Sequence, residues 1–265
     1  MDDLRHVLIE DSGFIAGLAT ARQADTRAYA ANLVRGSVLS EQTARTLVGR
    51  LVAALLQLKT KEDGPIASDV ARVVLAAVGP SSRVVGLDVV RDLLAHPMPE
   101  VQELGGELLL RRDLRTEPVP DALLLLLVQS EHAPLRALGL RLLALLAESE
   151  ATLLAQEELL IRLATSPVPD VRAAMRPLLG RLVAASSSAG ARAVESLLAA
   201  LLRRRLPEGI PAHIAALLSG ELAPALAALP VETAWRLLES EDGDAQTVGA
   251  ALLARHGAVL TVDVP

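Results

Sequence analysis

Apolar and small residues recur along this chain in one helical frame. An apolar residue is followed four positions later by a small residue, and seven and eight positions later by two apolar residues, as in Val101-Gly105-Leu108-Leu109. These positions lie on one face of an α-helix, so each copy predicts a helix with one buried side. The glycine predicts a close crossing by a neighbouring helix, because packing must offset its cost of about 1 kcal/mol relative to alanine.

The frame occurs seven times, although Thr26 replaces the apolar first residue in one copy, and Met175 and Ile214 replace the small residue in two others. We call the first residue of each copy its anchor. Successive anchors are 34 to 41 residues apart. Self-similarity at this period is typical of stacked helix pairs joined by loops of variable length. We therefore expect the second helix of a pair to start within a few residues of each anchor, and no β-sheet before residue 258. The anchors are Thr26, Ala67, Val101, Leu135, Val171, Ile210 and Ala245.

Prolines and polar turns place the boundaries of the central helices. Pro118 and Pro169 stand where helices begin, a position at which the missing N–H leaves no bond unmade. Asp170 and Glu100 follow such prolines, where an acidic side chain stabilises the positive end of a helix. The helices predicted in this way cover residues 118–130, 135–147, 150–165 and 169–185.

The breaks in the pattern indicate how the chain is organised. We expect a single repeat array over residues 1–257. Within it, the Ser-Ser-Ser-Ala-Gly stretch at 186–190 predicts a flexible linker or hinge, and residues 59–64 predict a polar loop. Residues 258–265 alternate apolar and polar side chains. That alternation predicts an extended tail that leads into a further domain.

Three anchors lie in similar proline-containing motifs. They read Pro169-Asp170-Val171-Arg172, Pro99-Glu100-Val101-Gln102 and Pro134-Leu135-Arg136, each before a Leu-Leu pair or its equivalent. These motifs resemble the HEAT-like α-solenoid repeat family, and in particular the arrays found inside large bacterial multidomain proteins. The resemblance implies an all-α fold, a right-handed superhelix of about seven helix pairs. Such arrays serve as scaffolds, adaptors and occasionally enzymes.

The resemblance also assigns a role to the residues that flank each anchor. In this family an acid before the anchor and an arginine after it form polar ladders between adjacent repeats. Asp170 and Arg172 match both members, whereas Pro134 replaces the acid before Leu135. The residues directly after the seven anchors form a column on the second helices: Arg27, Ser68, Gln102, Arg136, Arg172, Pro211 and Gln246. In this family the second helices line the concave surface. The alternative to a ladder is therefore that the column is a polar strip that binds a partner.

The composition of the chain excludes several kinds of reactive site and argues against some kinds of partner. The 265 residues include no cysteine, which excludes disulfides, thiolate catalysis and cysteine-ligated zinc, and which is compatible with a reducing cytoplasm. No secretory leader is evident, and the longest apolar run, residues 122–128, is too short to span a bilayer. The net charge of −6 and the aromatic content of 1% argue against a nucleic-acid surface, which needs a basic stripe and often stacking aromatics.

Individual reactive residues are mostly accounted for by structural roles. His96 and His132 lie in turns and could approach one another, but solvated turn histidines are the expectation and no metal site is predicted. No phosphate-binding, dinucleotide or nucleophile-elbow motif is present. The basic run 203–205 is expected to complement a helix C-terminus, with a phosphate contact as the alternative. Trp235 is expected in the core, with a binding hot spot as the alternative.

These observations predict a non-enzymatic protein-binding or scaffolding module in the cytoplasm. Its partner is another protein or other domains of the same polypeptide, and no cofactor, metal or catalytic residue is assigned. A nucleic-acid-binding protein and an enzyme on a HEAT-like scaffold are the two alternatives. Arginine makes bidentate contacts to carboxylates, which gives orientation as well as charge. The candidate binding residues are Arg136, Arg141, Arg172 and Arg176.

Overall fold

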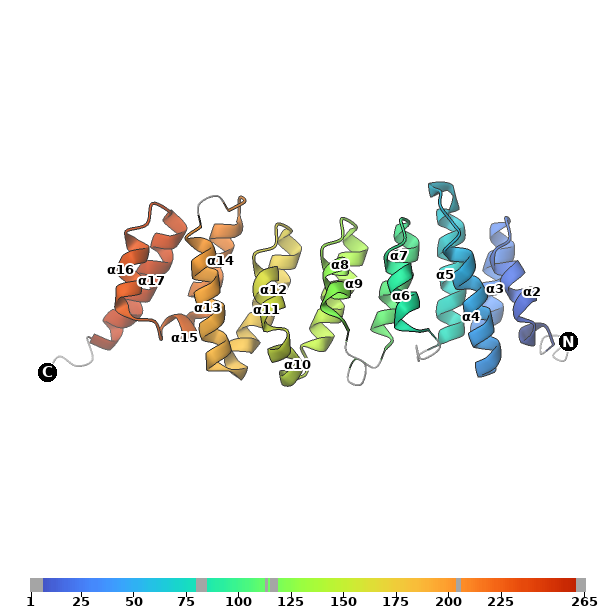
Figure 1. The fold of residues 1–265 in the computed structure, drawn as a ribbon, viewed down its shortest axis with the longest axis horizontal. Helices are drawn as coiled ribbons and strands as arrows, with labels where there is room; N and C mark the ends of the chain where they lie inside the picture. Colours follow the sequence, from blue (N-terminus) through green and yellow to red (C-terminus); the bar gives the residue numbers. More distant parts are fainter. Residues whose placement is uncertain (1–6, 80–84, 113, 115–118, 204–205, 261–265) are drawn as a thin grey trace. The chain divides into compact units, whose positions relative to one another are not determined.

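The computed structural model describes residues 7–79, 85–112, 114, 119–203 and 206–260, and every regular element in these ranges is helical (Figure 1). No strand occurs in the described ranges before residue 258, as the periodicity predicts. The chain divides into two compact units, Met1–Leu142 and Leu143–Pro265, and the division falls within α9. None of the described helices is both long and apolar enough to cross a lipid bilayer.

In the first unit, neighbouring helices in the sequence pack as pairs. Helix α2 packs on α3, α4 on α5, and α6 on α7, and the second members α3, α5 and α7 also pack on one another in sequence. Figure 1 shows the two partners of each pair side by side, joined by a turn. The elements are α2 Ser12–Ala19, α3 Ala24–Arg35, α4 Glu41–Leu55, the 3-10 helix η1 Lys61–Asp63, α5 Gly64–Val78, α6 Leu87–Leu94, α7 Pro99–Leu110, α8 Asp121–Val128 and α9 Ala133–Leu146.

Within the second unit the helices are paired in the same way, and two short helices are added. Helix α11 packs on α12, α13 on α14, and α16 on α17, while α12 contacts α13 and α14 contacts α17. The short helices α10 and α15 pack against α12 and α13 respectively. The elements are α10 Glu150–Ala155, α11 Glu157–Ala164, α12 Pro169–Ala185, α13 Ser187–Leu201, α14 Ile210–Ser219, α15 Ala223–Leu226, α16 Val231–Leu238 and α17 Gly243–Leu260.

The anchors mark where second helices begin. Helices α3, α5, α7, α9, α12, α14 and α17 each start at their anchor or at most three residues before it. Pro169 occupies the first turn of α12, as predicted, and Pro99 occupies the first turn of α7. The helix predicted over 118–130 is shorter and covers Asp121–Val128, and Pro118 lies outside the described ranges. The frame therefore predicts the location of every second helix in the described part of the chain.

The glycine at +4 marks a close crossing between the two helices of one pair. A Cβ on Gly139 would lie 2.8 Å from the Cβ of Leu127 and 2.9 Å from the backbone nitrogen of Val128, both on α8. Gly105 and Gly249 stand equally close to the helices that precede them, α6 and α16. This confirms the predicted reason for a small residue at this position, since a side chain would force the paired helices apart.

Several boundary predictions are wrong. Residues 186–190 are not a linker, because Ser186 ends α12 and its side chain accepts a hydrogen bond from the N–H of Ala189 to cap α13. The helix predicted over 150–165 breaks at Gln156 into α10 and α11, and neither glycine nor proline signals the break. The loop predicted over 59–64 contains η1. Helix α17 continues to Leu260, into the segment predicted as extended, and residues 261–265 lie outside the described ranges.

The hydrophobic core contains aliphatic side chains and no phenylalanine, tyrosine or tryptophan. Leucine, valine, alanine and isoleucine fill the buried positions, together with Met98 and Met175. The three aromatic residues of the chain are exposed: Phe14 by 39%, Tyr29 by 54% and Trp235 by 54%. The prediction that Trp235 lies in the core is wrong. Helix α16 buries Ala234 and Leu237 on its inner face. Trp235 points about 100° away from Ala234 and about 160° away from Leu237 around the helix axis, so its ring lies on the outer side.

Candidate functional site

The residue after the anchor closes the turn within its own helix pair. The Nη1 of Arg172 donates hydrogen bonds of 2.7 Å to the carbonyl of Ser166 and 3.0 Å to that of Pro167. Those carbonyls belong to the turn that follows the last residue of α11, Ala164. The guanidinium also places a positive charge at the negative end of that helix. We call this contact the turn clasp.

The turn clasp recurs with the same spacing. Arg27 donates to the carbonyls of Ala21 and Arg22, and Arg136 to those of Ser130 and Glu131. Where glutamine follows the anchor, its side-chain amide donates a hydrogen bond to the backbone carbonyl of the residue six positions before it. These bonds run from Gln102 to His96 at 2.7 Å and from Gln246 to Ser240 at 2.8 Å. These bonds lie within one pair, whereas the expected ladder links adjacent pairs.

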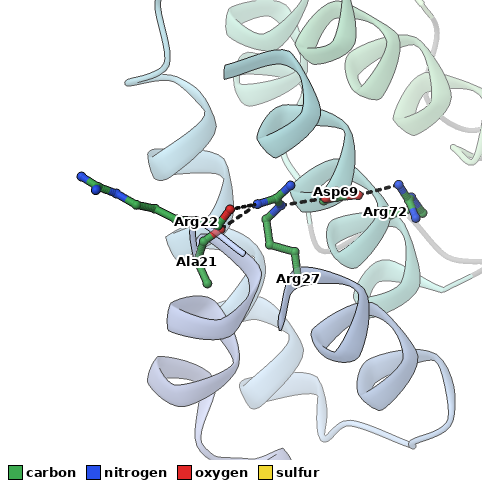
Figure 2. Close-up of polar contacts among 5 residues, drawn as sticks. All are labelled: Ala21, Arg22, Arg27, Asp69 and Arg72. Atoms are coloured by element: carbon green, nitrogen blue, oxygen red, sulfur yellow. Dashed lines mark hydrogen bonds and ion pairs between the residues drawn. The ribbon is translucent and has the colours of Figure 1, made fainter. Parts of the chain in front are cut away.

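Arg27 makes both kinds of contact (Figure 2). Its Nε donates a 2.7 Å bond to Asp69 on α5, the second helix of the next pair, and Arg72 binds the other carboxylate oxygen of Asp69. Arg27 is buried and Asp69 is mostly covered. This ion pair therefore joins two neighbouring helix pairs in the way that the resemblance predicts, although its acid lies two residues after an anchor instead of one residue before it.

A second set of arginines, which the sequence reasoning missed, lies ten residues after an anchor. Arg111 donates to the carbonyls of Leu75 and Gly79 at 2.7 and 2.9 Å, at the end of α5. Arg181 binds the carbonyl of Ala147 at 2.6 Å, and Arg255 makes longer contacts of 3.4 and 3.5 Å to the carbonyls of Ala223 and Ser219. Each guanidinium reaches the pair before its own. The recurrence of arginine at +10 in three copies is the signal that could have found this set.

The structure places the four candidate binding arginines in two groups. Arg136 and Arg141 lie on α9 in the first unit, and Arg172 and Arg176 lie on α12 in the second. Arg136 and Arg172 form turn clasps, and Arg172 is buried. Arg176 is bound to Glu221 at 2.8 Å. Arg141 is exposed, so its guanidinium is open to a partner.

A polar cluster surrounds the arginines of α12. Burial lowers the pKa of His213, and the positive charges of Arg172 and Arg176 lower it further. Burial alone would raise the pKa of Glu221, but the hydrogen bond and charge of Arg176 hold it below its ordinary value. Neutral His213 and ionised Glu221 therefore coexist at neutral pH. One buried atom of each, His213 Nε2 and Glu221 Oε2, has no hydrogen-bond partner among the described residues.

The other reactive residues have local structural surroundings. His96 is buried, so the expectation of a solvated turn histidine is wrong. Its Nδ1 accepts a 3.2 Å hydrogen bond from the N–H of Met98 within the turn. His132 is exposed. Within the described ranges, no three histidine or carboxylate side chains come together as metal ligands. Of the basic run 203–205, Arg203 is exposed beyond the end of α13, and residues 204 and 205 lie outside the described ranges.

Comparisons with known proteins add little to this geometry. No known family profile matches the sequence, and no curated protein is similar to it. Among solved structures, the chain is similar to a crystal structure of an engineered protein, at 20% identity and a TM-score of 0.43. The alignment covers 96% of this chain and 70% of the engineered protein. At that TM-score the likeness carries no weight for fold or function.

Proposed function

We propose that this chain is a non-enzymatic protein-binding or scaffolding module built as a HEAT-like α-solenoid. The repeated frame supports the repeat architecture, because each second helix begins at an equivalent position. The second helices that carry Gly105, Gly139 and Gly249 also meet the preceding helix at an equivalent close crossing. The turn clasps support it as well, since they recur in five of the seven copies. The arginines at +10 add contacts to the preceding pair in three copies. Such stacks present extended surfaces suited to macromolecules.

The exposure of every aromatic ring is the observation that carries the binding proposal. A chain that builds its core from aliphatic side chains leaves Phe14, Tyr29 and Trp235 on its surface. Tyrosine, tryptophan and phenylalanine are enriched at protein interfaces, where a large rigid ring gives contact area at low entropic cost. Tyr29 and Trp235 are the two most exposed rings, and they lie in different units.

Arg141 is the candidate for polar contact with the partner. It shares α9 with Arg136, whose guanidinium is held by the turn clasp, but Arg141 itself is exposed. An exposed guanidinium can bind a carboxylate of the partner with two parallel hydrogen bonds. The partner is another protein or other domains of the same polypeptide, and we place the interaction in the cytoplasm.

Quantitative capture tests this proposal. The full chain is immobilised and exposed to a cytoplasmic extract of its source, and bound proteins are measured by mass spectrometry. Tyr29→Ser and Trp235→Ser should each preserve the melting temperature, and at least one should reduce capture of a specific protein by about tenfold. Val38→Ser is the matched control, because Val38 is 97% exposed and apolar.

Two results would overturn the proposal. One is a captured set that does not differ between wild type and both aromatic variants. The other is capture that disappears after nuclease treatment of the extract, which would favour the nucleic-acid alternative.

A further inference from the structure

A groove in the second unit lies between the first helices of two successive pairs. Its walls are α13 and α16, with the segment that leads into α16 at one end. The hollow measures about 430 Å³, and six of its lining side chains are aliphatic or proline: Leu198, Ala199, Leu202, Leu229, Pro230 and Leu237. Leu202 is 53% exposed, an unusual position for a leucine that has buried neighbours on both sides of the groove.

The apolar groove leads into an acidic hollow. A second hollow of about 670 Å³ shares Leu202 with the first and extends to the turn between α16 and α17. Glu239, Glu241 and Asp242 line it, together with Arg203. Glu239 and Glu241 are exposed, whereas Asp242 accepts hydrogen bonds from the N–H groups of Asp244 and Ala245 at the start of α17.

An aromatic ring lies between carboxylates on the outer face of α16. Glu232, Trp235 and Glu239 are spaced by three and four residues, so they form one stripe along the helix. All three side chains are exposed. A tryptophan face attracts a lysine or arginine cation, and flanking carboxylates add to that attraction. Because Glu239 also lines the acidic hollow, the stripe and the hollow meet at this residue.

We propose that the α13–α16 groove binds a basic amphipathic segment of the partner protein, with apolar side chains seated around Leu202 and cationic side chains at Glu239, Glu241 and Trp235. The inference rests on the proposed protein-binding function and names the chemistry of one partner. Charge complementarity decides the occupant. Among the described residues that line the two hollows, the carboxylates Glu195, Glu239, Glu241 and Asp242 outnumber the guanidiniums Arg203 and Arg236.

The same charges disfavour two other classes of ligand. Phosphate groups of a nucleic acid would face Glu239 and Glu241, and anionic lipid headgroups would meet the same repulsion. An acidic peptide would also be repelled. A basic segment instead gains attraction at the acidic end and buries leucine side chains at the apolar end, the arrangement by which amphipathic helices dock into grooves.

Peptide selection on the full chain tests the proposal without a known partner. A phage-displayed library of random peptides is panned on the wild-type chain, and enriched peptides are synthesised. Their binding is then followed by the fluorescence of Trp235, which is the single tryptophan of the protein and therefore reports on α16 alone. Enriched sequences should combine lysine or arginine with leucine-like side chains.

Variants of the groove and a matched pair of control variants then locate the site. Leu202→Ser, and the double change Glu239→Lys with Glu241→Lys, should each weaken binding of an enriched peptide by at least about tenfold. The control is Glu148→Lys with Glu150→Lys, which makes the same charge change at the same spacing elsewhere in the second unit. It should weaken binding less than about threefold. Unchanged melting temperatures show that the variants fold.

The outcomes separate this inference from the proposed function. The groove proposal is overturned if the enriched peptides are acidic, if both groove variants bind them as tightly as wild type does, or if the control pair weakens binding as much as the groove variants do. In each case the chain would still be a binding module, with its site elsewhere. A library that yields no enriched peptide on wild type overturns the groove proposal as well. The proposed function is tested separately, by capture from the extract with the aromatic variants and with nuclease treatment.

Discussion

The guanidinium of Arg111 donates a 2.7 Å hydrogen bond to the carbonyl oxygen of Leu75, although the two residues are 36 positions apart. Arg111 stands at the end of α7 and Leu75 lies in the last turn of α5, so the bond joins the C-terminal ends of two second helices. A cation at such an end satisfies an unpaired carbonyl and complements the helix dipole. The same position in two later copies of the frame makes the same kind of contact.

Loss of a turn clasp should destabilise the fold. Arg172→Ala removes the donor to the carbonyls of Ser166 and Pro167 and leaves a void at a buried position. We expect the free energy of unfolding to fall by about 2 kcal/mol or more, since bonds to a charged donor contribute about 1.5–3 kcal/mol. Urea denaturation measures the change. Arg141→Ala, on an exposed site, should change it by less than about 0.5 kcal/mol, and equal losses in the two variants would contradict the clasp.

The glycine at +4 should not tolerate a methyl group. Alanine at position 139 would place its Cβ 2.9 Å from the backbone nitrogen of Val128, which cannot move without displacing α8. We expect Gly139→Ala to destabilise by about 1–3 kcal/mol, despite alanine's better helix propensity. Gly49→Ala is the control, because nothing lies within 4 Å of its added Cβ. It should leave stability unchanged or raise it by up to about 1 kcal/mol. A Gly139→Ala variant as stable as wild type would show that the crossing is loose.

Leucines at +8 should matter strongly and locally. Leu143 and Leu179 are at most 1% exposed, so Leu→Ala at either should cost about 2–5 kcal/mol. In a repeat array the contacts are between neighbours, so amide hydrogen exchange should first increase in the helices next to the mutated one. Exchange that increases uniformly along the whole chain would contradict this picture.

Acid should weaken the second unit through His213. Burial, together with Arg172 and Arg176, lowers the pKa of His213 in the folded chain. A histidine of this kind contributes stability that is present above its unfolded pKa of about 6.5 and is lost as the pH falls through its folded pKa, because the unfolded chain takes up the proton more readily. The melting temperature should therefore fall more steeply between about pH 7 and pH 5 in wild type than in His213→Gln. Parallel slopes would show that His213 does not titrate in this way.

The sequence predicts the regular part of this fold well, because helical periodicity is a local property. The anchors locate every second helix in the described ranges, and Gly139 predicts its own close crossing. The break at Gln156 and the continuous path through Ser186 could not be predicted in the same way. The first is decided by tertiary packing without a helix-breaking residue, and the second by a serine that caps a helix where a serine run suggests a loop.

The site was less predictable than the fold. The residue after the anchor is polar in six of the seven copies, and in five of them its side chain closes the turn. The pattern does not predict this contact, because it depends on where a side chain with several rotatable bonds points. Arg172 turns toward its own turn, whereas Arg27 also reaches Asp69 in the next pair. Trp235 was expected in the core because large aromatic rings are usually buried on average. Its neighbours Ala234 and Leu237 take the inner face of α16 instead.

Partner capture and thermal stability, measured together on two arginine variants of α9, test most directly whether binding and structure use different side chains. Arg141→Glu should weaken capture of the partner by about tenfold and leave the melting temperature unchanged. Arg136→Ala, which loses the bonds to the carbonyls of Ser130 and Glu131, should lower the melting temperature. If capture is untouched by Arg141→Glu while Arg136→Ala only destabilises the chain, this face is structural and the proposed binding role of its arginines is wrong.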